Sequence, residues 1–165
     1  MLKLVAKLLA RPAVVDWLIC RAMRTPYSHI TKDGDVYMER YWLFNPYPAD
    51  SSGKGNLLPS IRLHKIMRPD QDRHLHDHPW NARTFILRGW YLEEREGEFW
   101  DIERSEGETA ALKFGEFHAI TRVPECGVWT LFVTWRYRGT WGFLVNGKKV
   151  PWREYLNIES TNNAN

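Results

Sequence analysis

The sequence predicts an all-β protein, and two observations carry that prediction. From about residue 36 onward, short runs of aromatic and β-branched residues alternate with turn signals such as Glu96-Gly97 and Asn146-Gly147. The chain has 165 residues with 9 Trp, 7 Tyr and 7 Phe, which is typical of one β-rich domain with an aromatic core. Many short strands separated in this way indicate a sandwich or a barrel.

The first 30 residues differ from the rest, because their pattern is helical. Met1–Ala10 and Ala13–Arg24 are the two expected helices, with Pro12 between them. The apolar faces that we expect to pack comprise Leu2, Val5, Leu8 and Leu9 in the first helix and Val14, Trp17, Leu18 and Arg21 in the second. This hairpin should cover the domain or a neighbouring subunit. A membrane-surface anchor is the alternative, since no apolar run is long enough to span a membrane.

Residues 31–158 form the expected β domain, and residues 159–165 an expected disordered polar tail. The expected strands are Val36–Phe44, Ser60–Met67, Arg73–His78, Arg83–Arg88, Trp90–Arg95, Glu98–Glu103, Ala110–Lys113, Phe117–Val123, Val128–Tyr137 and Trp141–Val145. Ala49–Asn56 has the composition of a flexible loop that could act as a lid. Pro151–Leu156 should be one short helix with proline in its first turn.

Net charge and cysteine content bear on the partners of the protein and on the compartment in which it works. A net charge of +3 is too small to indicate nucleic-acid binding. Only Cys20 and Cys126 are present, far apart, which favours a reducing cytoplasm over a disulfide-stabilised secreted fold. The apolar N-terminal segment and the aromatic strand Val36–Phe44 offer more apolar surface than a small barrel needs. We therefore expect a homodimer.

The chemistry is concentrated in a stretch that holds three of the six histidines. His74, His76 and His78 alternate along an expected strand, so their imidazoles leave the same face. Pro79 should end regular pairing there. Closely set neutral imidazoles on a rigid element are good metal ligands.

Two motifs carry a resemblance to a known family. His76-Asp77-His78, with a later strand that ends in Gly89, and then Gly115-Glu-Phe-His118 resemble the two metal-binding motifs of the cupin superfamily. The resemblance covers roughly Ser60–Val145. It implies a small jelly-roll barrel in which His76, His78 and His118 converge on a divalent metal. The motif His-Asp-His-Pro-Trp also resembles a group of small bacterial and phage cupins.

The sequence departs from the usual cupin pattern at one ligand. A glutamate normally follows the second histidine by about five residues, but Arg83 or Ala82 stands there, and no acid lies between Asp77 and Glu93. A site of three histidines is similar to that of the thiol dioxygenases. This similarity implies Fe(II) as the favoured metal, with Ni, Zn or Mn possible. Coordination positions would stay open for a small-molecule substrate.

Other residues have two readings each. Arg83 could face the cavity and clamp an anionic substrate, or it could lie on the surface if the strand changes phase at Pro79. Tyr91 and Tyr137 (with Trp135) are candidates to line the cavity, although aromatic strand residues usually build core. Three more residues are expected outside the metal's direct ligands: His74 at the surface, His64 as a structural residue, and Asp77 paired on the opposite face.

Three function classes follow from these residues. The first is a metal-dependent enzyme with iron oxygenase chemistry that acts on a small polar molecule. The second is a metal-free cupin isomerase or epimerase for nucleotide sugars, with His74 and His76 as acid and base and with Arg62 and Arg83 on the phosphates. The third is an accessory cupin that binds a ligand without turnover. Metal content distinguishes the first class from the second.

Overall fold

The computed structural model describes residues 1–32, 34–48, 53–70 and 74–156. Part of the loop predicted over Ala49–Asn56 and the whole predicted tail 159–165 lie outside these residues. In chain order the elements are α1 (Leu2–Leu9), α2 (Pro12–Ala22), β1 (Ile30–Lys32), β2 (Asp35–Phe44), β3 (Ser60–Ile66), β4 (Trp80–Arg88), β5 (Trp90–Arg95), β6 (Ile102–Ser105), β7 (Thr109–Leu112), β8 (His118–Arg122), β9 (Val128–Tyr137), β10 (Gly142–Val145), β11 (Lys148–Pro151) and α3 (Trp152–Tyr155).

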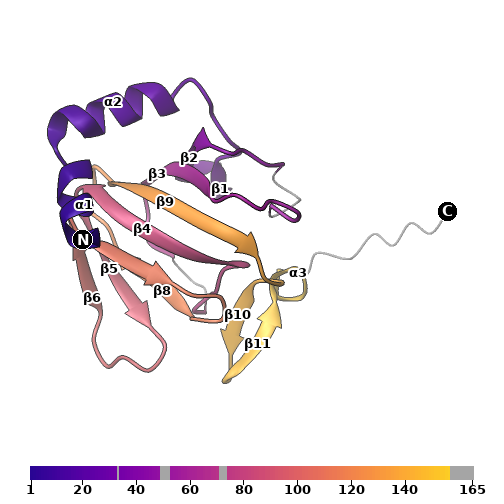
Figure 1. The fold of residues 1–165 in the computed structure, drawn as a ribbon. Helices are drawn as coiled ribbons and strands as arrows, with labels where there is room; N and C mark the ends of the chain where they lie inside the picture. Colours follow the sequence, from indigo (N-terminus) through magenta and orange to yellow (C-terminus); the bar gives the residue numbers. More distant parts are fainter. Residues whose placement is uncertain (33, 49–52, 71–73, 157–165) are drawn as a thin grey trace.

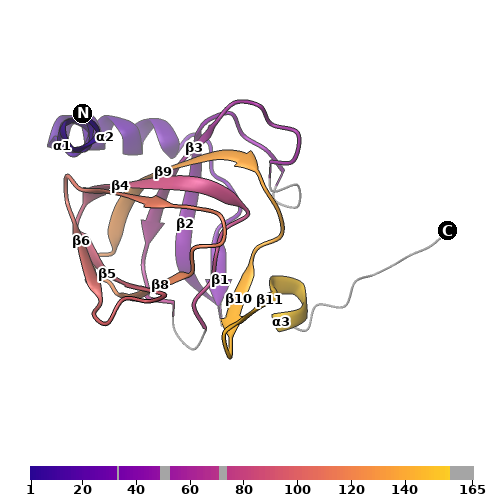
Figure 2. The same ribbon diagram turned by 60° about the horizontal axis from the view of Figure 1, so that its bottom comes forward.

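The strands form a large sheet and two smaller ones, all antiparallel. The large sheet has the order β1-β2-β3-β9-β4-β7, and the smaller sheets have the orders β6-β5-β8 and β10-β11. Single bridges from His76 to His118 on β8 and to Phe143 on β10 join the two smaller sheets into one layer. Figures 1 and 2 show this layer facing the large sheet. The predicted all-β jelly roll is confirmed, but the sheets do not close into a continuous barrel.

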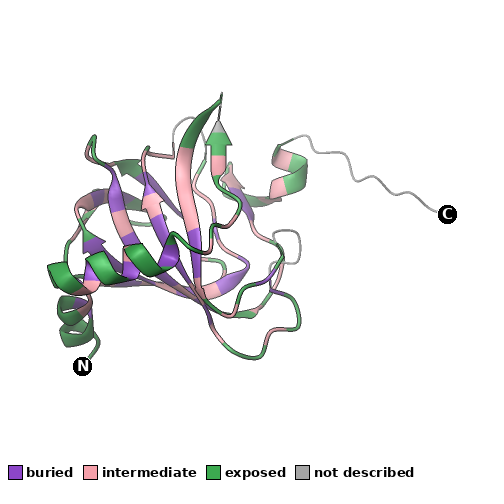
Figure 3. Cartoon of the chain, turned by 90° about the horizontal axis from the view of Figure 1, so that it is seen from above, coloured by how far each residue is buried: buried purple, intermediate pink, exposed green. Residues whose placement is uncertain are grey.

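The two N-terminal helices cover the outer face of the large sheet, on the side away from the smaller sheets (Figure 1). Their buried residues pack on one apolar cluster of β2, β3, β4 and β9. The cluster comprises Ala6, Val15, Leu18 and Ala22 from the helices and Tyr41, Leu63, Phe85, Leu87 and Leu131 from the sheet. The helical hairpin was predicted, but its packing faces only in part: Leu9, Val14 and Leu18 pack on the sheet as expected, while Ala6, Val15 and Ala22 were missed. Small residues at Ala6 and Ala22 let the helices approach the sheet closely, whereas Leu2, Val5, Leu8 and Trp17 are exposed. Figure 3 shows that much of the helical surface is exposed.

Several strand boundaries differ from the prediction. The predicted strand Arg73–His78 is reduced to the bridge at His76, and Arg73 lies outside the described residues. The strand β4 begins at Trp80, directly after Pro79. Proline has no amide hydrogen to donate to a neighbouring strand, so it is tolerated at this position. The predicted strand Glu98–Glu103 is shifted to β6, since residues 96–100 form turns and bends.

Two short strands were missed. One is β1, whose three residues pair with β2. The other is β11, which completes a hairpin with β10. The turn between them places Asn146 and Gly147 at φ 51° and 73°, the left-handed conformation that asparagine and glycine adopt most easily in hairpin turns.

The exposed side chains Leu2, Leu4, Val5 and Leu8 leave an apolar stripe on α1. The homodimer stays a prediction. Among the described residues, the helices are too short or too polar to cross a membrane.

Candidate metal centre

The segment that carries His76 and His78 is held on both sides by backbone hydrogen bonds. The amide of His76 donates to the carbonyl of His118 at 2.9 Å, and the amide of His118 donates back at 3.0 Å. On the other side, the amide of Leu144 donates to the carbonyl of Leu75 at 2.8 Å. Alternation of side chains along this extended segment then directs His76 and His78 to the same face, as predicted.

Asp77 lies between the two histidines and fixes the segment from the opposite face. Its carboxylate is fully buried; it accepts a hydrogen bond from the amide of Gly142 at 2.8 Å and pairs with the ammonium of Lys149 at 2.5 Å. A Cβ at position 142 would lie 2.2 Å from the carbonyl oxygen of Val150, so only glycine allows this close packing. Asp77 therefore pairs on the face opposite the two histidines, as expected, and neither it nor its two partners line the cavity.

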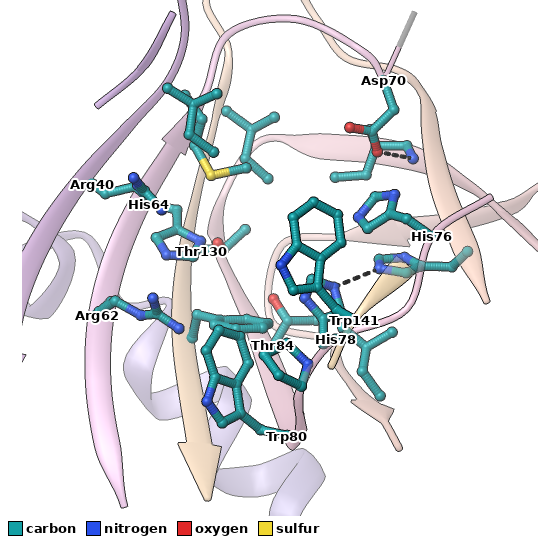
Figure 4. Close-up of a pocket in the computed structure, with 18 of the residues that line it drawn as sticks. Arg40, Arg62, His64, Asp70, His76, His78, Trp80, Thr84, Thr130 and Trp141 are labelled. Carbon is teal, nitrogen blue, oxygen red and sulfur yellow. Dashed lines mark hydrogen bonds between the residues drawn. The ribbon is translucent and has the colours of Figure 1, made fainter. Parts of the chain in front are cut away.

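The imidazoles of His76, His78 and His118 converge in the cavity. One ring nitrogen from each lies within 4.8 Å of the others. The Nε2 atoms of His78 and His118 are 2.9 Å apart, a contact that Figure 4 marks with a dashed line. Burial and the neighbouring His118 and His76 lower the pKa of His78 well below its ordinary value. The three rings thus present nitrogens to one point, and His78 is neutral, the form that ligates a metal.

A buried glutamate holds His118 from behind. The Oε1 atom of Glu93 lies 3.0 Å from Nδ1 of His118, and the residue is only 1% exposed. The same carboxylate pairs with Arg95 at 3.0 Å and with Arg104 at 2.8 Å. Burial alone would raise the pKa of Glu93, but His118 and Arg95 outweigh it and lower the pKa to about 2. Glu93 is therefore ionised and positions His118 with its Nε2 toward the cavity.

This arrangement fits a divalent metal held by the three histidines. A carboxylate behind one imidazole orients the ligating nitrogen and makes it more basic, as in many metal sites. After His78 the chain enters β4, where Trp80 and Thr84 face the cavity. No carboxylate from β4 therefore joins the three histidines as a metal ligand. The donor set is one of imidazoles alone, which suits Fe, Ni or Zn better than Mg or Ca.

The candidate centre lies at one wall of a cavity of about 410 Å³. The opposite wall is the large sheet, from which Arg40, Arg62 and His64 reach inward (Figure 4). Between the walls lie aromatic side chains, including Trp80, Phe132, Trp141 and Phe143. A small molecule in this cavity would contact both walls.

The residues predicted to bind substrate are divided between the cavity and the outside. Tyr91 lines the cavity and is buried. Arg83 lies on the outer face of the large sheet, because its neighbour Thr84 takes the inward position, and its guanidinium donates to Thr109 Oγ1 at 3.2 Å. Tyr137 packs beside a core cluster under the ammonium of Lys54, also outside the cavity lining. The inward reading of Arg83 and the cavity placement of Tyr137 are thus corrected.

Two histidines outside the candidate ligand set, His74 and His64, also had roles assigned from the sequence. His74 is exposed, with Nδ1 3.0 Å from the hydroxyl of Tyr155, and does not line the cavity. An acid–base pair of His74 and His76 inside the cavity is therefore not formed. His64, expected to be structural, lines the cavity on the wall opposite His76 and His78 (Figure 4).

Glu93 was missed by sequence reasoning, although a signal for it was present. In the predicted strand Trp90–Arg95 it shares the face of Tyr91, which was expected to point inward. A carboxylate on the inward face of a strand needs buried partners, and Arg95 on the same face is one of them. The second, Arg104, comes from β6, whose register could not be predicted.

Comparisons with known proteins agree with this fold. No family model matches the sequence, and no curated protein matches it significantly. The structure is similar to a cupin 2 conserved barrel domain protein from Rhodopseudomonas palustris, with a TM-score of 0.52, 14% identity, and coverage of 74% of this chain and 77% of the other. It is also similar to the polyketide cyclase RemF from Streptomyces resistomycificus, with a TM-score of 0.52, 16% identity, and coverage of 74% and 80%. The chain therefore has the cupin fold.

Proposed function

We propose that this protein binds one divalent metal on His76, His78 and His118 and acts on a small polar molecule held beside it. The observation that carries the proposal is the convergence of the three ring nitrogens within 4.8 Å, with an ionised glutamate 3.0 Å behind one of them. Fe(II) is the favoured metal, with Ni, Zn and Mn as alternatives. A metal on three neutral imidazoles would act as a Lewis acid with open positions, and Fe(II) would add redox chemistry.

The protein's own residues define the rest of the site. Glu93 fixes the ring of His118, and Asp77 fixes the segment that carries the other two histidines. Trp141 and Phe143 pack within 6.3 Å of the His76 ring and limit access of water to this wall. Tyr91, Thr84 and Thr130 line the cavity, and such hydroxyl-bearing side chains can hydrogen-bond a polar substrate.

The proposal is tested by elemental analysis of protein purified without chelators. We expect about one equivalent of divalent metal per chain, because three imidazoles meet in one place. His78→Ala and His118→Ala should each abolish or greatly reduce the bound metal. His74→Ala is the matched control, since His74 lies two residues from His76 but points to Tyr155.

Two results would contradict the proposal. One is a wild-type protein that takes up no iron, nickel, zinc or manganese at neutral pH. The other is a His78→Ala variant that keeps full metal content, which would place the metal elsewhere.

A further inference from the structure

The wall opposite the histidines is built by β3, whose inward residues include two nitrogen-rich side chains. Along this strand Ser60, Arg62, His64 and Ile66 alternate with residues that face the other side. Arg62 and His64 are 3% and 7% exposed, and both line the cavity. A guanidinium buried to this degree normally has a carboxylate partner.

Arg62 has no such partner among the described residues. Its guanidinium is surrounded by the rings of Trp42, Tyr47, Trp80 and Phe132, at 5.0–5.6 Å from their centroids. These rings cover the cation by cation–π contacts but accept no strong in-plane hydrogen bond. The Nε atom of Arg62 is buried and makes no hydrogen bond.

His64, two residues further along β3, is also buried against an aromatic ring and also has an unpartnered nitrogen. It stacks on Phe132 with ring centroids 5.1 Å apart, and its buried Nε2 makes no hydrogen bond. Burial, and then the charges of Arg62 and Arg40, lower its pKa well below the ordinary value. A neutral imidazole has one N–H donor and one acceptor nitrogen, so Nε2 of His64 is a second unused hydrogen-bonding group on the strand face of Arg62.

Among the described residues that line the cavity, positive charges outnumber negative ones. Three arginines line it, Arg40, Arg62 and Arg153, against one acid, Asp70. Asp70 is already occupied, since it accepts hydrogen bonds from the amide of Ile120 at 2.7 Å and from the hydroxyl of Tyr37. A buried cation without a counter-ion costs several kcal/mol, so a protein that keeps one has a use for it.

We propose that Arg62 and His64 form an anion-binding subsite that holds the carboxylate of a small organic acid in the cavity. The carboxylate would take the place of the missing counter-ion, because the planar guanidinium edge can bind it through two hydrogen bonds. One negative charge matches the one fully buried cation better than the two charges of a phosphate ester do. This inference rests on the proposed function in one respect: it makes the opposite end of the acid face His76, His78 and His118.

The test uses metal-free protein and three probes of similar shape: benzoate, benzamide and phenyl phosphate, with binding measured by calorimetry. Benzoate should bind saturably. Benzamide should bind about 30-fold more weakly or worse, the factor expected when a buried charge pair loses one partner. Equal binding of benzamide, tighter binding of phenyl phosphate, or no benzoate binding would each overturn the proposal.

Variants assign the effect to Arg62. Arg62→Met keeps the side-chain length and should weaken benzoate binding by about 30-fold or more, for the same reason. Its melting temperature should equal or exceed that of the wild type, because the cost of burying a cation without a counter-ion is removed and methionine can still pack against the four rings. Arg62→Lys keeps the charge and should bind benzoate between the two. Arg83→Met, on the outer face of the large sheet, is the matched control and should bind like the wild type.

The same experiments separate this subsite from the metal centre. Arg62→Met should still bind metal, and His118→Ala without metal should still bind benzoate. Benzoate binding that survives in Arg62→Met rejects the anion subsite alone. A wild-type protein that binds benzoate at Arg62 but takes up no metal rejects the proposed metal function alone.

Discussion

The two walls of the cavity, one with His76, His78 and His118 and the other formed by β3, differ in whether their buried charges have partners of opposite charge. On the histidine wall, the buried carboxylates of Glu93 and Asp77 have complete sets of partners, including Arg95, Arg104 and Lys149. On the wall formed by β3, Arg62 has aromatic neighbours and no counter-ion among the described residues. The charges that differ are therefore the buried carboxylates, which have cations beside them on the first wall, and the buried guanidinium of Arg62, which has no carboxylate beside it among the described residues.

The difference matches the roles that we propose for the two walls. Metal ligands must be held in place before the metal arrives, so the charges that hold them are satisfied within the protein. A subsite that captures an anion must leave its donors free, and the fold loses some stability by doing so. Removing a charge should therefore destabilise the first wall and spare the second. The predictions below test that contrast, from the largest effect to the smallest.

Glu93→Ala should have the largest effect on stability. It leaves Arg95, Arg104 and His118 around a cavity where the carboxylate was, and removing one partner of a buried ion pair costs about 3–5 kcal/mol. Urea denaturation measures the loss. Glu94→Ala is the control, because the adjacent Glu94 is exposed and should change the free energy of unfolding by less than about 0.5 kcal/mol. Equal stability of the two variants would show that Glu93 does not support this wall.

Acid should weaken the histidine wall through the same residue. Burial alone would raise the pKa of Glu93, but His118 and Arg95 lower it to about 2, below the ordinary 4.5. The folded-state pKa is thus depressed, so the contribution is complete above about pH 5 and is lost as pH falls towards 2. The total is roughly 3 kcal/mol. Unfolding of metal-free protein from pH 6 to pH 2 should show this loss. A wild-type slope retained in Glu93→Gln would assign it to other groups.

Asp77→Ala should have an intermediate effect. The amide of Gly142 loses a buried acceptor and the partly exposed Lys149 loses its partner, which together should cost about 2 kcal/mol. The segment of His76 and His78 should also become less ordered, so metal affinity should fall. Thermal unfolding and metal titration measure the two effects. Lys148→Ala, an exposed neighbour of Lys149, should change neither; if it matches Asp77→Ala, the buried pair is not the cause.

The smallest effect is expected at the surface. Arg88 on β4 pairs with Asp16 on α2 at 2.6 Å, but the two side chains are 45% and 66% exposed. Solvent screens such pairs, so Asp16→Ala should change the free energy of unfolding by about 0.5 kcal/mol or less. A loss comparable to that of Glu93→Ala would mean that burial does not decide the value of these pairs.

Most of the fold could be predicted because it depends on local pattern. Alternation of apolar residues and the glycine turns located β2, β3, β5 and β9 within a few residues. The helices were located too, but their buried faces only in part, since Leu9, Val14 and Leu18 were expected to pack and Ala6, Val15 and Ala22 were not. The face of a helix that packs on the sheet depends on how closely the helix can approach it. Ala6 and Ala22 are small enough to allow a close approach. Periodicity marks apolar residues, not the residues that a neighbouring surface accepts.

The sequence by itself determined that His76 and His78 share a face, since that follows from the two-residue period of an extended chain. Only the tertiary structure decided what surrounds them. It placed Glu93 behind His118 and turned Arg83 outward, and on the opposite wall it left Arg62 with no counter-ion among the residues that the structure describes. Each of these depends on the pairing of strands distant in sequence. One residue of register reverses the face that a side chain takes, and local sequence does not encode that register.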